Sequence, residues 1–164
     1  MMKPLYAAFG LSALLTACAT TTPSGNQGSA AANVDLSSER SGISGLRPLQ
    51  NAALPDKACG MVLWTLEGNR PAAVFRFVSG KKAEINIAGK PVELTRTDYD
   101  GAAGFGIFER QVFLGPDGVT VEVSARFGLG FPGGSYLEQG LVKVSDHNGW
   151  SMVSPTAGIA GCKN

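Results

Sequence analysis

The sequence predicts an all-β domain, a small antiparallel eight-stranded barrel or a curled sandwich, which follows a signal peptide and a flexible tether. Apolar and polar residues alternate over several short segments, as they do in strands with one buried face. Turn signals containing Gly, Asn or Asp separate these segments, and no stretch of about ten residues follows a helical period. Short strands joined by tight turns favour an antiparallel meander, and closure into a barrel would remove its exposed edges.

Residues 1–17 form the first element, which has the layout of a secretory signal peptide. Lys3 precedes an apolar run from Leu5 to Leu15, and small residues lead to Cys18. The run covers about eleven residues, whereas a membrane-spanning helix needs about twenty. We therefore expect a leader rather than a transmembrane anchor, and the alternative is an ordinary signal peptide that happens to end near a cysteine.

The segment Leu15-Thr16-Ala17-Cys18 resembles the lipobox of bacterial lipoproteins. The resemblance implies that the Cys18 thiol is alkylated by diacylglycerol and that the mature chain begins at this residue. Because each buried methylene contributes about 0.8 kcal/mol, two or more acyl chains anchor a protein stably. In that family an Asp after the cysteine retains the protein in the inner membrane, and this chain has Ala19 there. We therefore expect a lipid-anchored protein of the cell envelope, in the outer membrane and facing the periplasm.

Residues 18–55 form the second element, the lipidated N-terminus and its tether. Thr, Ser, Gly and Ala dominate this stretch, which cannot bury enough apolar surface to offset its ordering entropy. A coil of about thirty-seven residues spans roughly 35 Å. Ile43, Leu46, Leu49 and Leu54 near its end suggest docking onto the folded domain as an irregular segment, or one short helical turn.

Residues 56–164 form the third element, which is long enough for one compact domain. Alternation predicts strands within 73–78, 83–87, 92–95, 119–124 and 141–144, and three more candidates lie in 61–66, 106–114 and 150–153. Turn signals occupy 67–69, 79–80, 89–91, 100–101, 116–118 and 148–149.

Two cysteines frame this domain. Cys59 lies near its start and Cys162 near its end, and an exported compartment is oxidising enough to join them. Such a disulfide would close a loop of roughly one hundred residues, which the chain-entropy model values at about 4.7 kcal/mol. Two buried free thiols or a metal pair are the alternatives, although His147 is the single histidine and the chain has no Cys-x-x-Cys motif.

Charge and motifs argue against several function classes. Removal of the leader leaves thirteen basic and thirteen acidic residues, and the longest basic run is Lys81-Lys82, so we expect no nucleic-acid partner. His147 sits in a predicted turn, and the chain has no Gly-x-Ser-x-Gly elbow. Asp98, Asp100 and Glu109 have part of the spacing of a calcium loop, but alanines occupy its central positions. We therefore expect no enzyme, no metal and no cofactor.

The combination of a lipobox, a polar tether, the hairpin Ala-Glu-Ile-Asn-Ile-Ala-Gly-Lys-Pro-Val-Glu-Leu and two framing cysteines resembles the membrane-bound inhibitors of C-type lysozyme. The similarity covers about one hundred residues and implies an eight-stranded barrel on a lipid anchor. In that family a Ser-Gly-x-x-Tyr loop enters the lysozyme cleft. This chain has Asp100 in place of the serine and Gly104 in place of the tyrosine, with Phe105 beside it. A carboxylate at Asp100 would repel the acidic groups of such a cleft.

The glycine-dense segment 128–134 supplies the last candidate contacts. Leu129 and Phe131 suggest a rim loop that contacts a partner, whereas a long structural connection is the alternative. We expect a non-catalytic binding or structural lipoprotein whose partner is a protein or an envelope component; the alternative is an inhibitor of a cell-wall hydrolase of the C-type lysozyme kind. An inhibitor should carry Phe105 or Phe131 on protruding loops at one end of the barrel.

Overall fold

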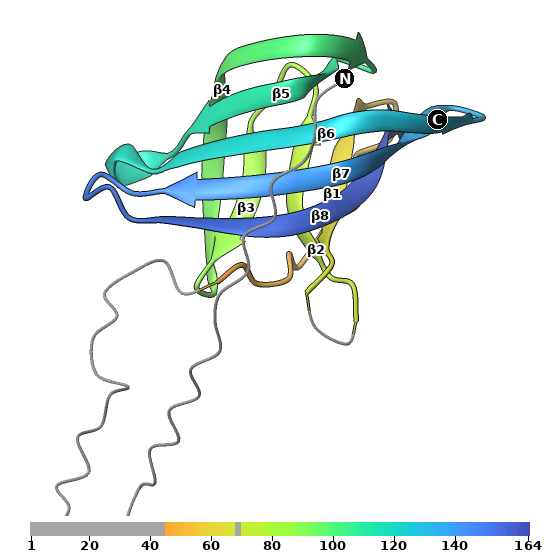
Figure 1. The fold of residues 1–164 in the computed structure, drawn as a ribbon. Helices are drawn as coiled ribbons and strands as arrows, with labels where there is room; N and C mark the ends of the chain where they lie inside the picture. Colours follow the sequence, from red (N-terminus) through yellow and green to blue (C-terminus); the bar gives the residue numbers. More distant parts are fainter. Residues whose placement is uncertain (1–44, 68–69) are drawn as a thin grey trace, which may run out of the picture. The chain divides into compact units, whose positions relative to one another are not determined.

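The computed structural model describes residues 45–67 and 70–164, which fold into a closed eight-stranded antiparallel barrel (Figure 1). The all-β fold and the barrel expected from the sequence are confirmed. The strands are β1 (Cys59–Thr65), β2 (Ala73–Val78), β3 (Ala83–Ile87), β4 (Lys90–Gly104), β5 (Ile107–Leu114), β6 (Thr120–Phe131), β7 (Gly134–Ser145) and β8 (Ser151–Cys162). The leader, the lipobox and most of the tether, including Cys18 and Ile43, lie outside the described residues.

The barrel is a meander in which each strand pairs with the next. β8 then returns to pair with β1, from Cys59 opposite Cys162 to Thr65 opposite Thr156. In Figure 1 the strands β6, β7 and β8 run side by side across the front of the molecule. Closure gives every strand two hydrogen-bonded neighbours, so the barrel offers no free strand edge to another chain.

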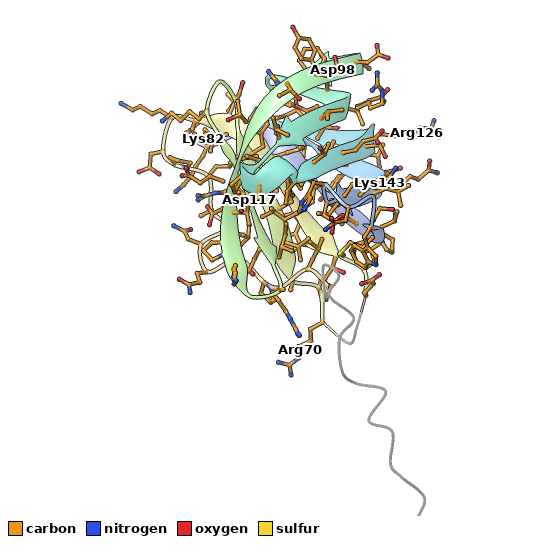
Figure 2. All side chains as sticks on the ribbon, turned by 90° about the vertical axis from the view of Figure 1, so that its left-hand side faces the viewer. Arg70, Lys82, Asp98, Asp117, Arg126 and Lys143 are labelled. Carbon is orange, nitrogen blue, oxygen red and sulfur yellow. A yellow bond between two sulfur atoms is a disulfide. The ribbon has the colours of Figure 1, made fainter. Side chains whose placement is uncertain are left out.

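Side chains fill the barrel interior. The rings of Phe75 and Phe77 meet Phe113 edge to face, with centroids 5.2 and 5.1 Å from it, and none of the three is more than 1% exposed. Smaller apolar side chains from the other strands complete the core: Met61, Leu63, Ala83, Ile85, Leu94, Ile107, Val121, Val123, Ala125, Leu137, Val142, Val144 and Ala160. Charged side chains project outward (Figure 2). An eight-stranded barrel is just wide enough for such filling, so we look for binding sites on its ends and outer surface.

The last part of the predicted tether belongs to the folded domain. Residues 45–58, here called the N-terminal strap, begin with a β-bridge between Leu46 and Ile87. The Arg47 amide donates to the Asn86 carbonyl over 2.9 Å, and the Leu49 amide donates to the Ala73 carbonyl over 2.8 Å. Leu49 is buried. The strap therefore docks in an extended form, and the described residues 45–58 contain no helical turn. Contacts with the barrel are already present at Leu46, about ten residues before residue 56.

One predicted turn and the predicted glycine-dense loop are largely strand segments. Asp100-Gly101 lies inside β4, where Asp100 pairs with Arg110, and β-bulges follow Arg96 and Asp100. A bulge accommodates the positive φ of Gly101 (88°) as readily as a chain reversal does, so the Asp-Gly signal is ambiguous. The glycine-dense segment 128–134 is also mostly strand, because β6 runs to Phe131 and β7 starts at Gly134.

Candidate functional site

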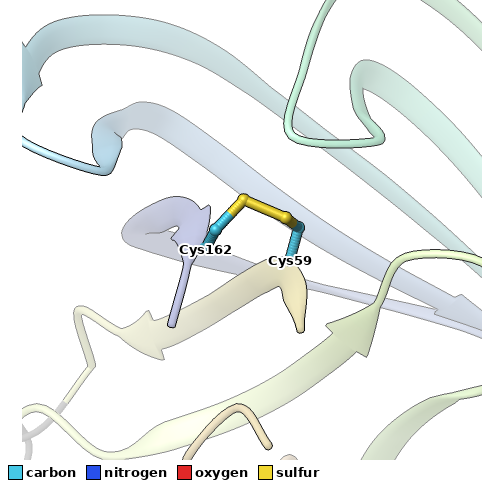
Figure 3. Close-up of a disulfide and its surroundings, with 2 residues drawn as sticks. All are labelled: Cys59 and Cys162. Carbon is cyan, nitrogen blue, oxygen red and sulfur yellow. A yellow bond between two sulfur atoms is a disulfide. The ribbon is translucent and has the colours of Figure 1, made fainter. Parts of the chain in front are cut away.

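The disulfide marks one end of the barrel, here called the disulfide end. Cys59 and Cys162 are the first residue of β1 and the last of β8, with Cα atoms 3.9 Å apart, and their sulfurs are bonded (Figure 3). The predicted pairing is confirmed. The Ser79 amide donates to the Cys59 carbonyl and the Cys162 amide donates to the Gly133 carbonyl. These bonds tie the β2–β3 and β6–β7 turns to the disulfide.

The β4–β5 hairpin covers part of the core at this end. It reverses at Phe105 and Gly106, which have φ values of 57° and 76°. Phe105 is half-buried and packs against the core. A Cβ on Gly106 would collide with the Ser79 side chain, so the β4–β5 and β2–β3 turns touch. Phe105 is therefore chiefly a cover of the core rather than a freely protruding contact.

Asp100 lies on the outer side of the same hairpin in an ion pair. Its carboxylate is 3.2 Å from the Arg110 guanidinium and accepts a hydrogen bond from the Gly101 amide over 2.8 Å. The hydrogen bond from the Gly101 amide is the main reason why the pKa of Asp100 lies below its ordinary value, and Arg110 lowers this pKa further. Arg110 also lies 3.9 Å from Asp98. The bare carboxylate expected from the sequence is thus neutralised by a cation, which lies beside two of the three carboxylates of the considered calcium loop.

Arg96 orders this hairpin and was missed by the sequence reasoning. Its guanidinium carbon lies 4.9 Å from the ring centroids of Phe77 and Tyr99 and 5.3 Å from that of Phe108. The same group donates to the fully buried Gln111 over 2.8 Å and to the Gly106 carbonyl over 2.9 Å. Cation–π contacts and hydrogen bonds together hold the hairpin over the core. The sequence does contain one indication of this role. Arg96 follows the buried Leu94 by two residues, so both side chains lie on the inner face of β4.

The β6–β7 hairpin carries the other two predicted contacts. Leu129 is 77% exposed, and Phe131 is 36% exposed with its ring centroid 5.2 Å from that of Tyr136. The Ser135 hydroxyl lies 3.1 Å from the Gly128 carbonyl and 3.4 Å from the Leu129 carbonyl, which braces the hairpin across its two strands. The structure therefore presents Leu129 and Phe131 on an ordered hairpin rather than on a long loop.

An apolar groove of about 290 Å³ lies beside this hairpin, between the N-terminal strap and the outer face of β1 and β8. Leu54 of the strap, Val62 of β1, Ile159 of β8 and Phe131 supply its walls. Val62 pairs with Ile159, which pairs with Tyr136, so the groove continues into the Phe131–Tyr136 pair. Lys163 at its rim forms an ion pair of 2.7 Å with Asp56, which lowers the pKa of that carboxyl.

The catalytic and metal candidates are not brought together. Within residues 45–67 and 70–164, no three His, Cys, Asp or Glu side chains are placed to hold a metal ion. His147 is exposed in the β7–β8 turn. No helix in the described part of the chain is long and apolar enough to cross a membrane.

Comparison with models of known families, with curated proteins and with solved structures finds no match to this chain.

Proposed function

We propose that this protein is a lipid-anchored cell-envelope protein whose barrel is a non-catalytic binding module, and that it binds through the disulfide end. The observation that carries the proposal is the ordered β6–β7 hairpin, which presents Leu129 and the Phe131–Tyr136 pair beside an apolar groove. Because the barrel interior is filled, recognition by this domain has to use its surface.

The size and lining of the groove favour a protein segment as the ligand. Pockets for small molecules usually enclose about 300–1,000 Å³ and bury most of the ligand. This groove has about 290 Å³ and opens onto exposed aromatic rings, which suits an apolar side chain of a partner. Buried aromatic anchors commonly carry most of the energy of such interfaces.

A pull-down from envelope extract tests the binding proposal when it is paired with variants. We expect Leu129→Ser and Phe131→Ala to reduce the amount of captured partner, because each removes apolar surface from the hairpin. Leu114→Ser is the matched control, since Leu114 is 48% exposed on β5 at the opposite end of the barrel. Equal capture by all three variants and by the unmodified domain would refute the proposal.

Lipid anchoring is tested separately through Cys18→Ser. The substitution removes the thiol that would be acylated, so the variant should leave the membrane fraction while the unmodified protein partitions into detergent. Retention of the variant in membranes after a carbonate wash would show that the anchor proposal is wrong.

Inhibition of a C-type lysozyme is the second candidate function, and the closed eight-stranded barrel supports it because the resembled family has that architecture. The position that should hold the inhibitory serine, Asp100, is however paired within β4 and held by Arg110, and Gly104 is also a strand residue. Neither residue lies in a loop, which weighs against the loop insertion of the resembled family. We therefore expect little or no loss of lytic activity at micromolar concentrations of the domain, and potent inhibition would instead favour this second function.

A further inference from the structure

The outer surface of the barrel is divided between a charged and an uncharged part. The ion pairs Arg76–Glu84, Lys82–Glu93 and Arg110–Asp100 all lie on strands β2 to β5. On β8, by contrast, none of the outward-facing residues is charged: Ser151, Val153, Pro155, Ala157 and Ile159. The uncharged part therefore follows β8 and β1, whereas β7 carries the exposed Glu138 and Lys143.

Four exposed apolar side chains lie on or beside this part at the end opposite the disulfide, whereas Leu129 and Tyr136 are exposed toward the disulfide end. Leu66 is 58% exposed, Val153 53%, Leu141 45% and Trp150 39%. The Leu66 amide donates to the Pro155 carbonyl over 3.1 Å, and Pro155 pairs with Leu141, so one apolar row crosses from the end of β1 to β7. Val153 lies two residues from Pro155 on the same face of β8. We call Leu66, Leu141, Trp150, Val153 and Pro155 the apolar corner.

We propose that the apolar corner docks onto the bilayer surface to which the chain is anchored, an inference that rests on the proposed lipid anchor at Cys18. Twenty-six residues separate Cys18 from Gly45, where the described chain begins. A coil of that length spans roughly 30 Å, which is comparable to the diameter of the domain. The anchor thus keeps the domain within reach of the membrane, and docking would orient it.

The size of the apolar corner favours a lipid surface over a second copy of the chain. It covers three strands spaced about 4.8 Å apart and a few residues of about 3.3 Å each, a footprint on the order of 200 Å². A stable dimer buries about 800 Å² on each partner. A bilayer needs no minimum area, and Trp150 at the margin has the amphipathic ring that prefers the membrane interface.

The charges around the apolar corner nearly balance. They are Glu67, Arg70, Glu122, Lys143 and Asp146, with His147 in the same turn as Asp146. Arg70 and Lys143 project away from the barrel (Figure 2). Glu122 lies opposite Lys143, and the acidic groups outnumber the basic ones three to two. Docking should therefore depend on apolar contact rather than on anionic lipid, and salt should not reverse it.

Cysteine labelling of the acylated protein in phosphatidylcholine vesicles tests the proposal. We expect Val153→Cys to react with a membrane-impermeant maleimide at least fivefold more slowly there than in soluble residues 19–164, which contain the whole barrel with its core, strap and disulfide. The matched control is Leu129→Cys at the disulfide end, which should react equally fast in both settings. Adding Leu66→Ser and Leu141→Ser should return the Val153→Cys rate to its value in solution, and 1 M NaCl should not.

The outcomes separate the two proposals. A protein that anchors in the vesicles but labels equally at both positions overturns the docking alone. A protein that never anchors overturns the lipid anchor and the docking with it. If residues 19–164 sediment as a dimer that Val153→Asp dissociates, the apolar corner belongs to a second copy and the membrane assignment is wrong.

Discussion

Removal of the disulfide should lower the stability of the barrel strongly without abolishing the fold. In the variant Cys59→Ser/Cys162→Ser, the native pairing of β1 with β8 along seven residues remains available, so the main change is in the unfolded chain. The bond joins residues 103 positions apart, and freeing a loop of that length costs at most about 4.7 kcal/mol. Since domains are stable by about 5–15 kcal/mol, we expect a folded but weakened protein that has lost about 3–4.7 kcal/mol.

Urea unfolding followed by circular dichroism measures this loss. In thermal unfolding, each kcal/mol of lost stability lowers the Tm of a domain of this size by roughly 4 °C. The expected loss therefore corresponds to a fall in Tm of about 12–19 °C. Reductant should bring the unmodified protein to the midpoint of the variant and leave the variant unchanged. A difference in the free energy of unfolding below about 1 kcal/mol would refute the reasoning, because the bond would then restrict the unfolded chain very little.

Three further predictions concern the core, the strap and acid. Phe113→Ala should lower the free energy of unfolding by about 3–5 kcal/mol, because the ring is fully buried between two others; a loss below 1 kcal/mol in urea would contradict a filled interior. Leu49→Ala should cost about 2 kcal/mol in the same assay, and no cost would mean that the strap does not pack. Asp56 and Asp100 have lowered pKa values, so their contribution to stability is present above their ordinary value of 3.8 and is lost as pH falls through the folded-state pKa. NMR titration of the two carboxyl carbons should give midpoints below 3.8, and a midpoint at or above that value would contradict the hydrogen-bonded geometry.

The strands that the sequence predicts best are those that alternate clearly. Segments 73–78 and 83–87 match β2 and β3. In β3 one phase is apolar and the other polar, and in β2 Arg76 alone interrupts a run of apolar residues. β8 was predicted only as 150–153, although it runs to Cys162. Its second half consists mainly of Thr, Ala, Gly and Ile. These residues do not alternate between polar and apolar, so the strand cannot be recognised from the sequence pattern. Strand length there is decided by the hydrogen bonds to β1 and β7.

The candidate site could be predicted only in part. The position of Leu129 and Phe131 near one end of a barrel follows from a glycine-dense turn between two strands. The groove does not, because Leu54 of the strap meets Val62 and Ile159 only through contacts between segments far apart in the sequence. The Arg110–Asp100 pair likewise depends on register, because a shift of one strand by one residue would place the two side chains on opposite faces of the sheet.

Local pattern alone therefore predicted an all-β domain, either a barrel or a curled sandwich, and favoured the pairing of Cys59 with Cys162 over free thiols or a metal pair, because alternation, turn chemistry and cysteine count can be read without the tertiary structure. The structure decided for the closed barrel and the disulfide. The leader and lipobox also follow from local pattern and stay predictions. Only the tertiary structure decided which apolar residues face the core and which form the outer surface. On β1 and β8 both phases of the strand are uncharged, so the sequence cannot tell inside from outside, and closure of the barrel leaves Leu66 and Val153 exposed.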